Sequence, residues 1–142
     1  MKVTMKKVII RMLKTNALIE EQLNAAIKSY AVSLPQFNVL RILRGNQKQP
    51  ASLSTLQEKM IKPMSNTTRL VDKLVDKGLV RREICSSNRR KVDIRITNKG
   101  LEMLTKLDQS IDQAETQLMS ALTPEEMKTL FQLIEKMQLS KK

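Results

Sequence analysis

Residues 65–97, SNTTRLVDKLVDKGLVRREICSSNRRKVDIRIT, form the stretch of sequence that decides the fold. On a helical wheel of 100° per residue, the apolar residues between Leu70 and Val75 share one side and the polar residues share the other. Gly78 can adopt the left-handed backbone conformation that ends a helix. After Gly78 the apolar period changes to two, which is typical of strands. The stretch therefore predicts a helix, a tight turn and a two-stranded hairpin.

Two features of this stretch favour a nucleic-acid partner. The outer face of the predicted helix is polar and rich in hydrogen-bonding groups at its N-terminal end. The predicted hairpin connection, Ser86–Lys91, has three consecutive cations and no apolar residue. This is the layout of a winged helix-turn-helix, in which the helix enters a major groove and the hairpin tip reaches the neighbouring minor groove. The alternative is a surface helix followed by a solvated basic hairpin.

The residues before this stretch complete a helix-turn-helix. Ser33–Gln36 has the form of a capping box and predicts a helix that stops at Gly45. Ala51–Leu53 is expected to be extended and to pair with the hairpin, and Ser54–Gln57 repeats the capping-box pattern at the start of the next helix. Lys62–Met64 is expected to form the turn before the outer-face helix. The helix that starts at Ser54 is expected to bury Leu56, Met60 and Ile61.

Long amphipathic helices are predicted at both ends of the chain. Residues 3–30 repeat apolar side chains at helical spacing, and Thr97 can cap a helix that continues to Leu122. A helix of about 25 residues is about 37 Å long, so it outreaches a small winged domain. Thr123–Glu126 is a third capping box and starts a last helix. We expect these helices to pack against a second copy of the chain; the alternative folds them back within one chain.

The predicted fold class is mainly α with a small β-hairpin (α+β). We expect a single domain over residues 1–142, with a winged DNA-binding part at 33–99 and dimerisation helices at 1–32 and 100–142. A dimer would supply the two-fold geometry with which helix-turn-helix proteins read a duplex.

The net charge is +12, from 26 Lys or Arg and 14 Asp or Glu. Residues 59–99 hold 12 of these cations and 4 of the acidic residues, whereas residues 100–142 hold 5 and 7. A localised basic field is typical of a protein that binds a polyanion.

The composition disfavours several other classes. No apolar run is long enough for a membrane span, we recognise no signal peptide, and a single cysteine cannot form an internal disulfide, so we expect a cytoplasmic protein. The absence of histidine and of a glycine-rich phosphate loop disfavours an enzyme and most metal sites. We expect no cofactor. The rival hypothesis is a basic amphipathic protein that binds a membrane or partner proteins without reading sequence.

Three motifs together resemble the MarR (multiple antibiotic resistance regulator) family of winged-helix transcriptional regulators. Leu34–Leu40 is similar to the start of the family's second helix, Thr68–Arg82 to its recognition helix, and Asn88–Gly100 to its wing and the start of its long helix. The resemblance implies a cytoplasmic homodimer, often a repressor, that binds double-stranded DNA at a pseudo-palindromic operator. It also implies release by a small phenolic or amphipathic compound, or by an oxidant. Asn88 departs from the family's usual aspartate, which braces the wing arginines.

The residues that we expect to contact DNA follow from this layout. Arg reads guanine, Asn reads adenine, and a Thr methyl group meets the methyl group of thymine. Lysine contacts phosphate more often than bases, and the hydroxyl groups at the start of the preceding helix can also donate to phosphate. The resemblance assigns the arginine that enters the minor groove to Arg90. The candidates are Ser65, Asn66, Thr68 and Arg69 for bases, Lys73, Ser54 and Thr55 for phosphates, and Arg89, Arg90 and Lys91 for the wing.

Several of these residues have a structural alternative. Ser65 can serve only as a helix cap, Asn66 can be a surface residue of the first turn, and the hydroxyls of Ser54 and Thr55 can serve only in capping. Arg82, Arg89 and Arg90 would favour the thiolate form of Cys85 and its oxidation. The resemblance, however, places oxidant-sensing cysteines near the N-terminal helix, where this sequence has none. Nine methionines fit either an adaptable effector cleft or an ordinary core, so we assign no effector residues.

Overall fold

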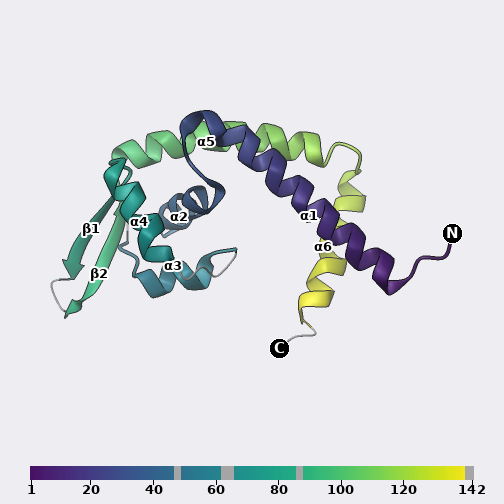
Figure 1. Cartoon of the computed structure of the whole chain (residues 1–142), viewed down its shortest axis with the longest axis horizontal. Coiled ribbons are helices and arrows are strands. Elements are labelled where there is room, and N and C mark those ends of the chain that lie inside the picture. The colour runs from purple at the N-terminus through teal and green to yellow at the C-terminus, as the bar shows by residue number, and fades with distance from the viewer. Residues whose placement is uncertain (47–48, 62–65, 86–87, 140–142) are drawn as a thin grey trace.

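The structure, a computed structural model, describes residues 1–46, 49–61, 66–85 and 88–139. Figure 1 shows an arch in which α5 runs along the top and α1 slants from the top down to the N-terminus on the right, with the hairpin on the left side and α6 on the right. The chain is mainly helical with one antiparallel hairpin, which confirms the predicted fold class. In order, the elements are α1 (Met5–Ile27), the 3-10 helix η1 (Lys28–Tyr30), α2 (Leu34–Gly45), α3 (Leu53–Lys59), α4 (Thr67–Asp76), β1 (Val80–Cys85), β2 (Asn88–Ile96), α5 (Asn98–Leu118) and α6 (Pro124–Leu139).

Three predicted helix starts are confirmed by their capping hydrogen bonds. The Gln36 N–H donates to Ser33 Oγ at 3.3 Å, and the Ser33 N–H donates to Gln36 Oε1 at 3.2 Å. The Gly100 N–H donates to Thr97 Oγ1 at 3.0 Å and so starts α5. The third capping box, before α6, has the Thr123 N–H donating to a Glu126 carboxylate oxygen at 2.9 Å. These short-range bonds place the helix ends where the sequence alone predicts them.

The start of α3 differs from the prediction. Ser52, not Ser54, is the N-cap, because its backbone is extended and its Oγ accepts the Thr55 N–H at 3.1 Å. The preceding Ala51 forms an isolated antiparallel bridge with Ile94 of β2, so the expected pairing with the hairpin is confirmed. This bridge fixes the chain just before α3 and moves the helix start two residues earlier.

The end of α3 also corrects one predicted core residue. Met60 leaves the helix with an extended backbone, and its side chain is buried. Ile61 follows outside the helix and is 71% exposed, so the prediction that it lies in the core is wrong. Helical spacing placed it inside only on the assumption that the helix continued. The predicted turn at Lys62–Met64 lies outside the described residues.

The helix after the hairpin is shorter than predicted. It ends at Leu118, and the chain then turns through Ser120 and Leu122 before α6 begins. The helix at the N-terminus also has a modified end, because its last turn changes to the 3-10 helix η1. Ala31 follows in a left-handed conformation with φ 56°, which reverses the chain into α2.

The hydrophobic core lies between α2, α4, the hairpin and the first turns of α5. A close approach at Gly100 helps to form it, since a Cβ atom there would lie only 2.2 Å from the carbonyl oxygen of Leu79. No helix in the described ranges combines the length and the apolar character that a membrane crossing requires. The fully covered aliphatic side chains are Ile27, Val39, Leu40, Leu56, Val71, Leu74, Ile94, Leu104 and Leu107.

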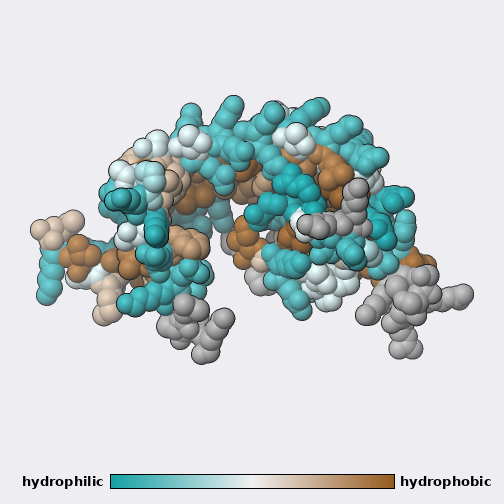
Figure 2. Space-filling view, turned by 180° about the vertical axis from the view of Figure 1, so that it is seen from behind, coloured by the Kyte–Doolittle hydropathy of each residue, from teal (hydrophilic) through white to brown (hydrophobic). Residues whose placement is uncertain are grey.

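Two surfaces at the far end of the arch keep their apolar side chains exposed. Val8, Ile9 and Leu13 of α1 are 42%, 48% and 65% exposed, and Phe131 of α6 is 62% exposed. Figure 2 shows hydrophobic groups at the surface of this end of the molecule, on the left of the view. The single chain therefore leaves uncovered the apolar stripes that the sequence predicts for the terminal helices.

Candidate nucleic-acid interface

The two faces of α4 separate as the sequence predicts. Thr67, Leu70, Val71 and Leu74 are buried against the core, whereas the intervening polar side chains are exposed. Gly78, with φ 74°, then turns the chain into β1, so the predicted left-handed position is confirmed. The core thus holds α4 by one side and leaves the other side free to contact a ligand.

The candidate base-facing residues gather at the N-terminal half of α4. Asn66 is the N-cap residue and is exposed, but its side chain forms no capping hydrogen bond, so its amide is not used by the helix. Thr68 and Arg69 are exposed on the next turn, and Lys73 lies one turn beyond Arg69. The side chains of Arg69 and Lys73 form no hydrogen bond or ion pair with other described residues. Ser65 lies outside the described residues, so its two alternatives stay predictions.

The hydroxyl groups at the start of α3 belong to a small network. Ser52 Oγ lies 3.0 Å from Ser54 Oγ and 3.0 Å from Thr55 Oγ1. Because Ser52 supplies the cap, the interpretation of Ser54 as the capping residue is wrong. Ser54 is exposed and Thr55 is half-buried. A phosphate contact from these hydroxyl groups stays a prediction.

The hairpin differs from the predicted six-residue connection. β2 begins at Asn88, which pairs with Cys85, so only residues 86–87 lie between the strands. The next pair toward the base is Ile84 with Val92, and the register shifts between them. The three residues from Arg89 to Lys91 therefore form an irregularity in β2 and do not belong to the loop. Such bulges bend a strand and change the direction of its side chains.

The side chains of Arg89, Arg90 and Lys91 lie outside what the structure describes. Their backbone places all three at the end of the hairpin that is far from the core, because the opposite end, at Val80 and Ile96, is packed against it. The predicted cluster of three cations is therefore together on one strand. Which groove its side chains enter stays a prediction.

An ion pair joins the hairpin to α4. Arg82 of β1 donates through a guanidinium nitrogen to the Asp72 carboxylate of α4, with the two side chains 34% and 51% exposed. The sequence predicts that Asp72 lies on the polar outer face of this helix but gives no partner for its carboxylate. The pair neutralises a charge that would repel phosphate, and it ties the hairpin to α4. Only the reversal of the chain at Gly78 brings these two residues together.

The C-terminal end of α4 carries cations that the sequence analysis did not select. Lys99 donates through Nζ to the Lys77 carbonyl oxygen at 3.0 Å. Lys77, the C-cap residue of α4, places its own ammonium group on the Ala31 carbonyl oxygen, in the connection between α1 and α2. Cations are favourable at this end of a helix because its carbonyl groups carry the negative end of the dipole. The sequence does not predict these contacts, because both lysines bind groups that are distant along the chain.

A cavity of about 420 Å³ lies apart from α4, between α1, α2, α5 and the end of α3. Its lining combines apolar side chains such as Leu23 and Phe37 with polar ones such as Asn24 and Arg41. It is of the size of many small-molecule sites. Within the described ranges, no group of three or more Cys, Asp or Glu is arranged to hold a metal ion.

Comparisons with known proteins agree with this geometry. A sequence model described as the MarR family matches residues 32–92. The fold is similar to that of a MarR-like transcription regulator from Bacillus cereus, with 25% identity over 95% of this chain and 96% of that one, and a TM-score of 0.86.

Two further structures share the fold. A mutant of MarR from Escherichia coli, complexed with operator DNA, matches with 24% identity over 95% of this chain and 99% of that one, and a TM-score of 0.82. BpsR from Bordetella bronchiseptica, whose DNA binding is regulated by 6-hydroxynicotinic acid, matches with 18% identity over 97% and 98% of the chains and a TM-score of 0.84.

Proposed function

We propose that this chain, which belongs to the MarR family, is a homodimeric regulator that binds double-stranded DNA at a pseudo-palindromic operator and represses transcription. Residues 33–99 would form the DNA-binding part, and residues 1–32 and 100–142 would form the dimerisation part. One observation carries the proposal: the polar side of α4 is exposed beside a hairpin that ends in three cations.

Charge supports DNA as the partner of this surface. Residues 59–99 carry most of the chain's excess of cations, and the Asp72 carboxylate on α4 is paired with Arg82. Because DNA affinity depends strongly on phosphate neutralisation, such a surface binds duplexes and does so less tightly as salt rises. Arg69 and Asn66 would read bases, Lys73 would contact phosphate, and the hairpin cations would reach the minor groove.

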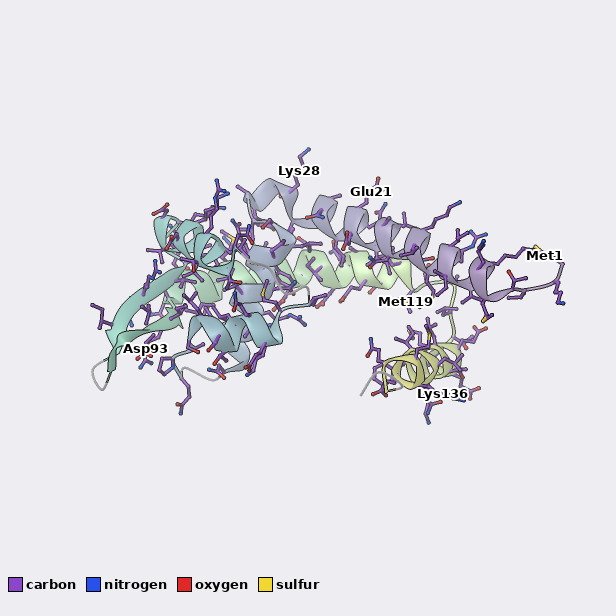
Figure 3. The ribbon with its side chains drawn as sticks, turned by 60° about the horizontal axis from the view of Figure 1, so that its bottom comes forward. Met1, Glu21, Lys28, Asp93, Met119 and Lys136 are labelled. Carbon is purple, nitrogen blue, oxygen red and sulfur yellow. The ribbon has the colours of Figure 1, made fainter. Side chains whose placement is uncertain are left out.

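The terminal helices support a dimer. Their exposed apolar side chains, among them Ile9 and Phe131, gather at the end of the arch away from the hairpin. Figure 3 gives the same arrangement from another side, with Lys136 of α6 and Asp93 of the hairpin at opposite ends. A second copy packed on this end would cover these side chains and would present two α4 helices to one duplex.

A small-molecule effector is the finer part of the proposal. The cavity between α1, α2 and α5 has an apolar lining with a few polar groups, which suits an amphipathic or phenolic compound. It touches both the dimerisation helices and the DNA-binding part, so a ligand there would favour one arrangement of the two. Thermal stabilisation of the protein by members of a phenolic panel, together with DNA release, would test it.

The first test is a gel shift on the DNA upstream of the protein's own gene, with excess nonspecific competitor. A duplex that shifts despite the competitor supports sequence-specific binding. If no duplex shifts and the protein instead binds anionic vesicles or partner proteins, the rival hypothesis of a basic amphipathic protein is favoured. Turnover in a broad substrate panel would be needed to revive an enzymatic role.

The second test separates base reading from phosphate contact. Arg69→Ala should cost about 1–3 kcal/mol of operator binding and relax the preference at one base pair per half-site. Equal weakening on every sequence would make Arg69 a phosphate contact instead.

The wing has a matched test. Arg90→Ala should leave folding almost unchanged and flatten the slope of log affinity against log salt by about 0.9 for each phosphate that the variant no longer touches. Arg90→Lys should restore part of this slope but less of any preference for A·T-rich flanks, because arginine is favoured in a narrow minor groove. Unchanged affinity and slope in Arg90→Ala would leave the hairpin cations as solvated charges.

A further inference from the structure

We infer that Lys77 is a positioning residue that sets the angle of α4 against the two long helices, and therefore the half-site spacing that the dimer prefers. The inference rests on the proposed function, since spacing has meaning only for a dimer that reads DNA with two copies of α4. It is carried by side-chain contacts at the C-terminal end of α4, away from the candidate base-facing residues.

Lys77 joins α4 to a segment that is distant in the sequence. Its backbone N–H closes α4 by donating to the Lys73 carbonyl oxygen at 3.2 Å. Its ammonium group donates to the Ala31 carbonyl oxygen, 46 residues earlier, and to Gln36 Oε1 at 3.4 Å. Ala31 lies in the connection between α1 and α2, and Gln36 lies in the first turn of α2. One side chain therefore links the end of the proposed reading helix to the turn that follows α1 and η1, and to the start of α2.

The connection that Lys77 binds has a conformation that needs support. Ala31 is left-handed, and residues with a Cβ atom adopt this conformation reluctantly. Such conformations persist where their surroundings hold them. Gln36 is buried and its Oε1 also accepts the Ser33 N–H at 3.2 Å, so it cannot swing away from Lys77 without breaking the capping box. The Lys77 ammonium group thus meets a fixed amide and a constrained turn.

Two hydrogen bonds from the start of α5 hold the backbone at Lys77 and Gly78. Lys99 donates through Nζ to the Lys77 carbonyl oxygen at 3.0 Å, and Thr97 Oγ1 donates to the carbonyl oxygen of Gly78 at 2.7 Å. Both donors lie at the beginning of α5. Figure 1 shows that the end of α1, the beginning of α5 and α4 lie close together on the hairpin side of the arch. The Lys77 side chain therefore ties the end of α4 to the connection that follows α1, and the Lys77 carbonyl group ties it to α5.

Lysines often stabilise the C-terminal end of a helix, so a stabilising effect alone would not show that Lys77 positions α4. The preferred half-site spacing distinguishes a positioning residue from a helix cap. The two half-sites of a duplex bound by such a dimer lie about 34–36 Å apart. Adding one base pair moves one half-site by about 3.4 Å and rotates it by roughly 36°. A rigidly held α4 should bind this altered duplex with low affinity. An α4 that lacks the Lys77 hydrogen bonds can change its orientation and should lose less affinity.

The experiment uses duplexes selected by the wild-type protein from a randomised pool. The affinity of each protein is then measured for the selected spacing and for spacings changed by one base pair. Lys77→Met should lower the ratio of the two affinities by about threefold to tenfold, the net effect expected for one ordinary hydrogen bond. Its salt slope should stay that of the wild type, because Lys77 is not proposed to touch phosphate.

Two matched variants serve as controls. Lys77→Arg keeps a charged donor and should restore most of the spacing ratio. Lys106→Met removes the same charge from an exposed position of α5 and should keep the wild-type ratio. If Lys77→Met does not fold, Lys77→Gln is measured in the same series, since its shorter side chain cannot reach the Ala31 carbonyl oxygen.

Two results would overturn the inference. A folded Lys77 variant with the wild-type spacing ratio would reduce the residue to a helix cap. A lower salt slope with equal loss at every spacing would make it a phosphate contact. If the wild-type protein selects no duplex, the proposed function fails, and the inference fails with it. This outcome differs from one in which the wild type binds DNA but the Lys77 variant has the same spacing ratio.

Discussion

The two ends of the arch differ in how completely their apolar side chains are covered. At the hairpin end, α2, α4 and the strands enclose side chains such as Leu40, Leu74 and Ile94 with no exposed surface. At the other end, Leu130 and Phe131 of α6 are 40% and 62% exposed, and the first half of α1 has no buried residue. The core at the hairpin end is therefore complete within a single chain. The apolar side chains at the other end are those that a second copy of the chain would bury.

The largest expected effect tests the uncovered end. Leu130→Asp would place an unpaired charge in the proposed interface, which should weaken dimerisation by more than about 3 kcal/mol. Sedimentation at micromolar concentration should then detect monomers, and operator binding should fall because the half-sites are no longer read together.

A control on the same helix sharpens this test. Gln132→Asp adds the same charge on the polar side of α6 and should leave the dimer intact. If Leu130→Asp stays dimeric, α6 does not form the interface, and the contrast between the two ends loses its explanation.

The second prediction concerns the covered end. Leu74→Ala removes a fully buried side chain and should lower the free energy of unfolding by about 2–5 kcal/mol, because the cavity cannot be refilled by the packed neighbours. Urea denaturation measures this change. Leu13→Ala, at a position that is 65% exposed in the single chain, is the comparison for folding within one chain. A small effect of Leu74→Ala would mean that the hairpin end is loosely packed.

The third prediction compares two glycines, one in the first turn of α5 and one at the end of α2. Gly100→Ala would bring a Cβ atom within 2.2 Å of the Leu79 carbonyl oxygen and 2.7 Å of Ile96 Cγ1. It should therefore destabilise the protein by about 1–3 kcal/mol, although alanine is the better helix former.

Gly45, at the end of α2, is the matched control, because nothing lies within 4 Å of its added Cβ atom. Gly45→Ala should stabilise the protein by about 0.4–1 kcal/mol. Thermal denaturation of the two variants gives shifts of opposite sign if close packing, and not helix propensity, decides the result at Gly100.

The smallest expected effect lies on the surface between α4 and the hairpin. Arg82→Ala breaks a partly exposed ion pair with Asp72, and such pairs contribute about 0–1 kcal/mol to folding. The free energy of operator binding should fall by more than the free energy of unfolding, because the Asp72 charge is then left unpaired near phosphate. Asp72→Asn with Arg82→Ala should recover part of that affinity. Equal losses in the single and double variants would exclude this electrostatic explanation.

The sequence by itself determined the elements and most of their limits. The capping boxes at Ser33 and Thr123, the cap at Thr97 and the left-handed Gly78 are short-range features, so three or four neighbouring residues specify them. The two faces of α4 and the alternating hairpin follow from periodicity. These features, together with the basic charge of residues 59–99, were enough to predict a winged helix-turn-helix and its candidate DNA-binding residues.

The tertiary structure decided what depends on contacts between distant residues. The bridge between Ala51 and Ile94 holds the chain just before Ser52, the N-cap residue of α3. Met60 is buried, whereas Ile61 lies outside the core. The register shift placed Arg89–Lys91 in β2 and not in the loop. The pairing of Asp72 with Arg82, and of Lys77 with Ala31, has no signal in the sequence. Local backbone preferences act over a few residues, whereas these contacts exist only after the chain has folded back on itself.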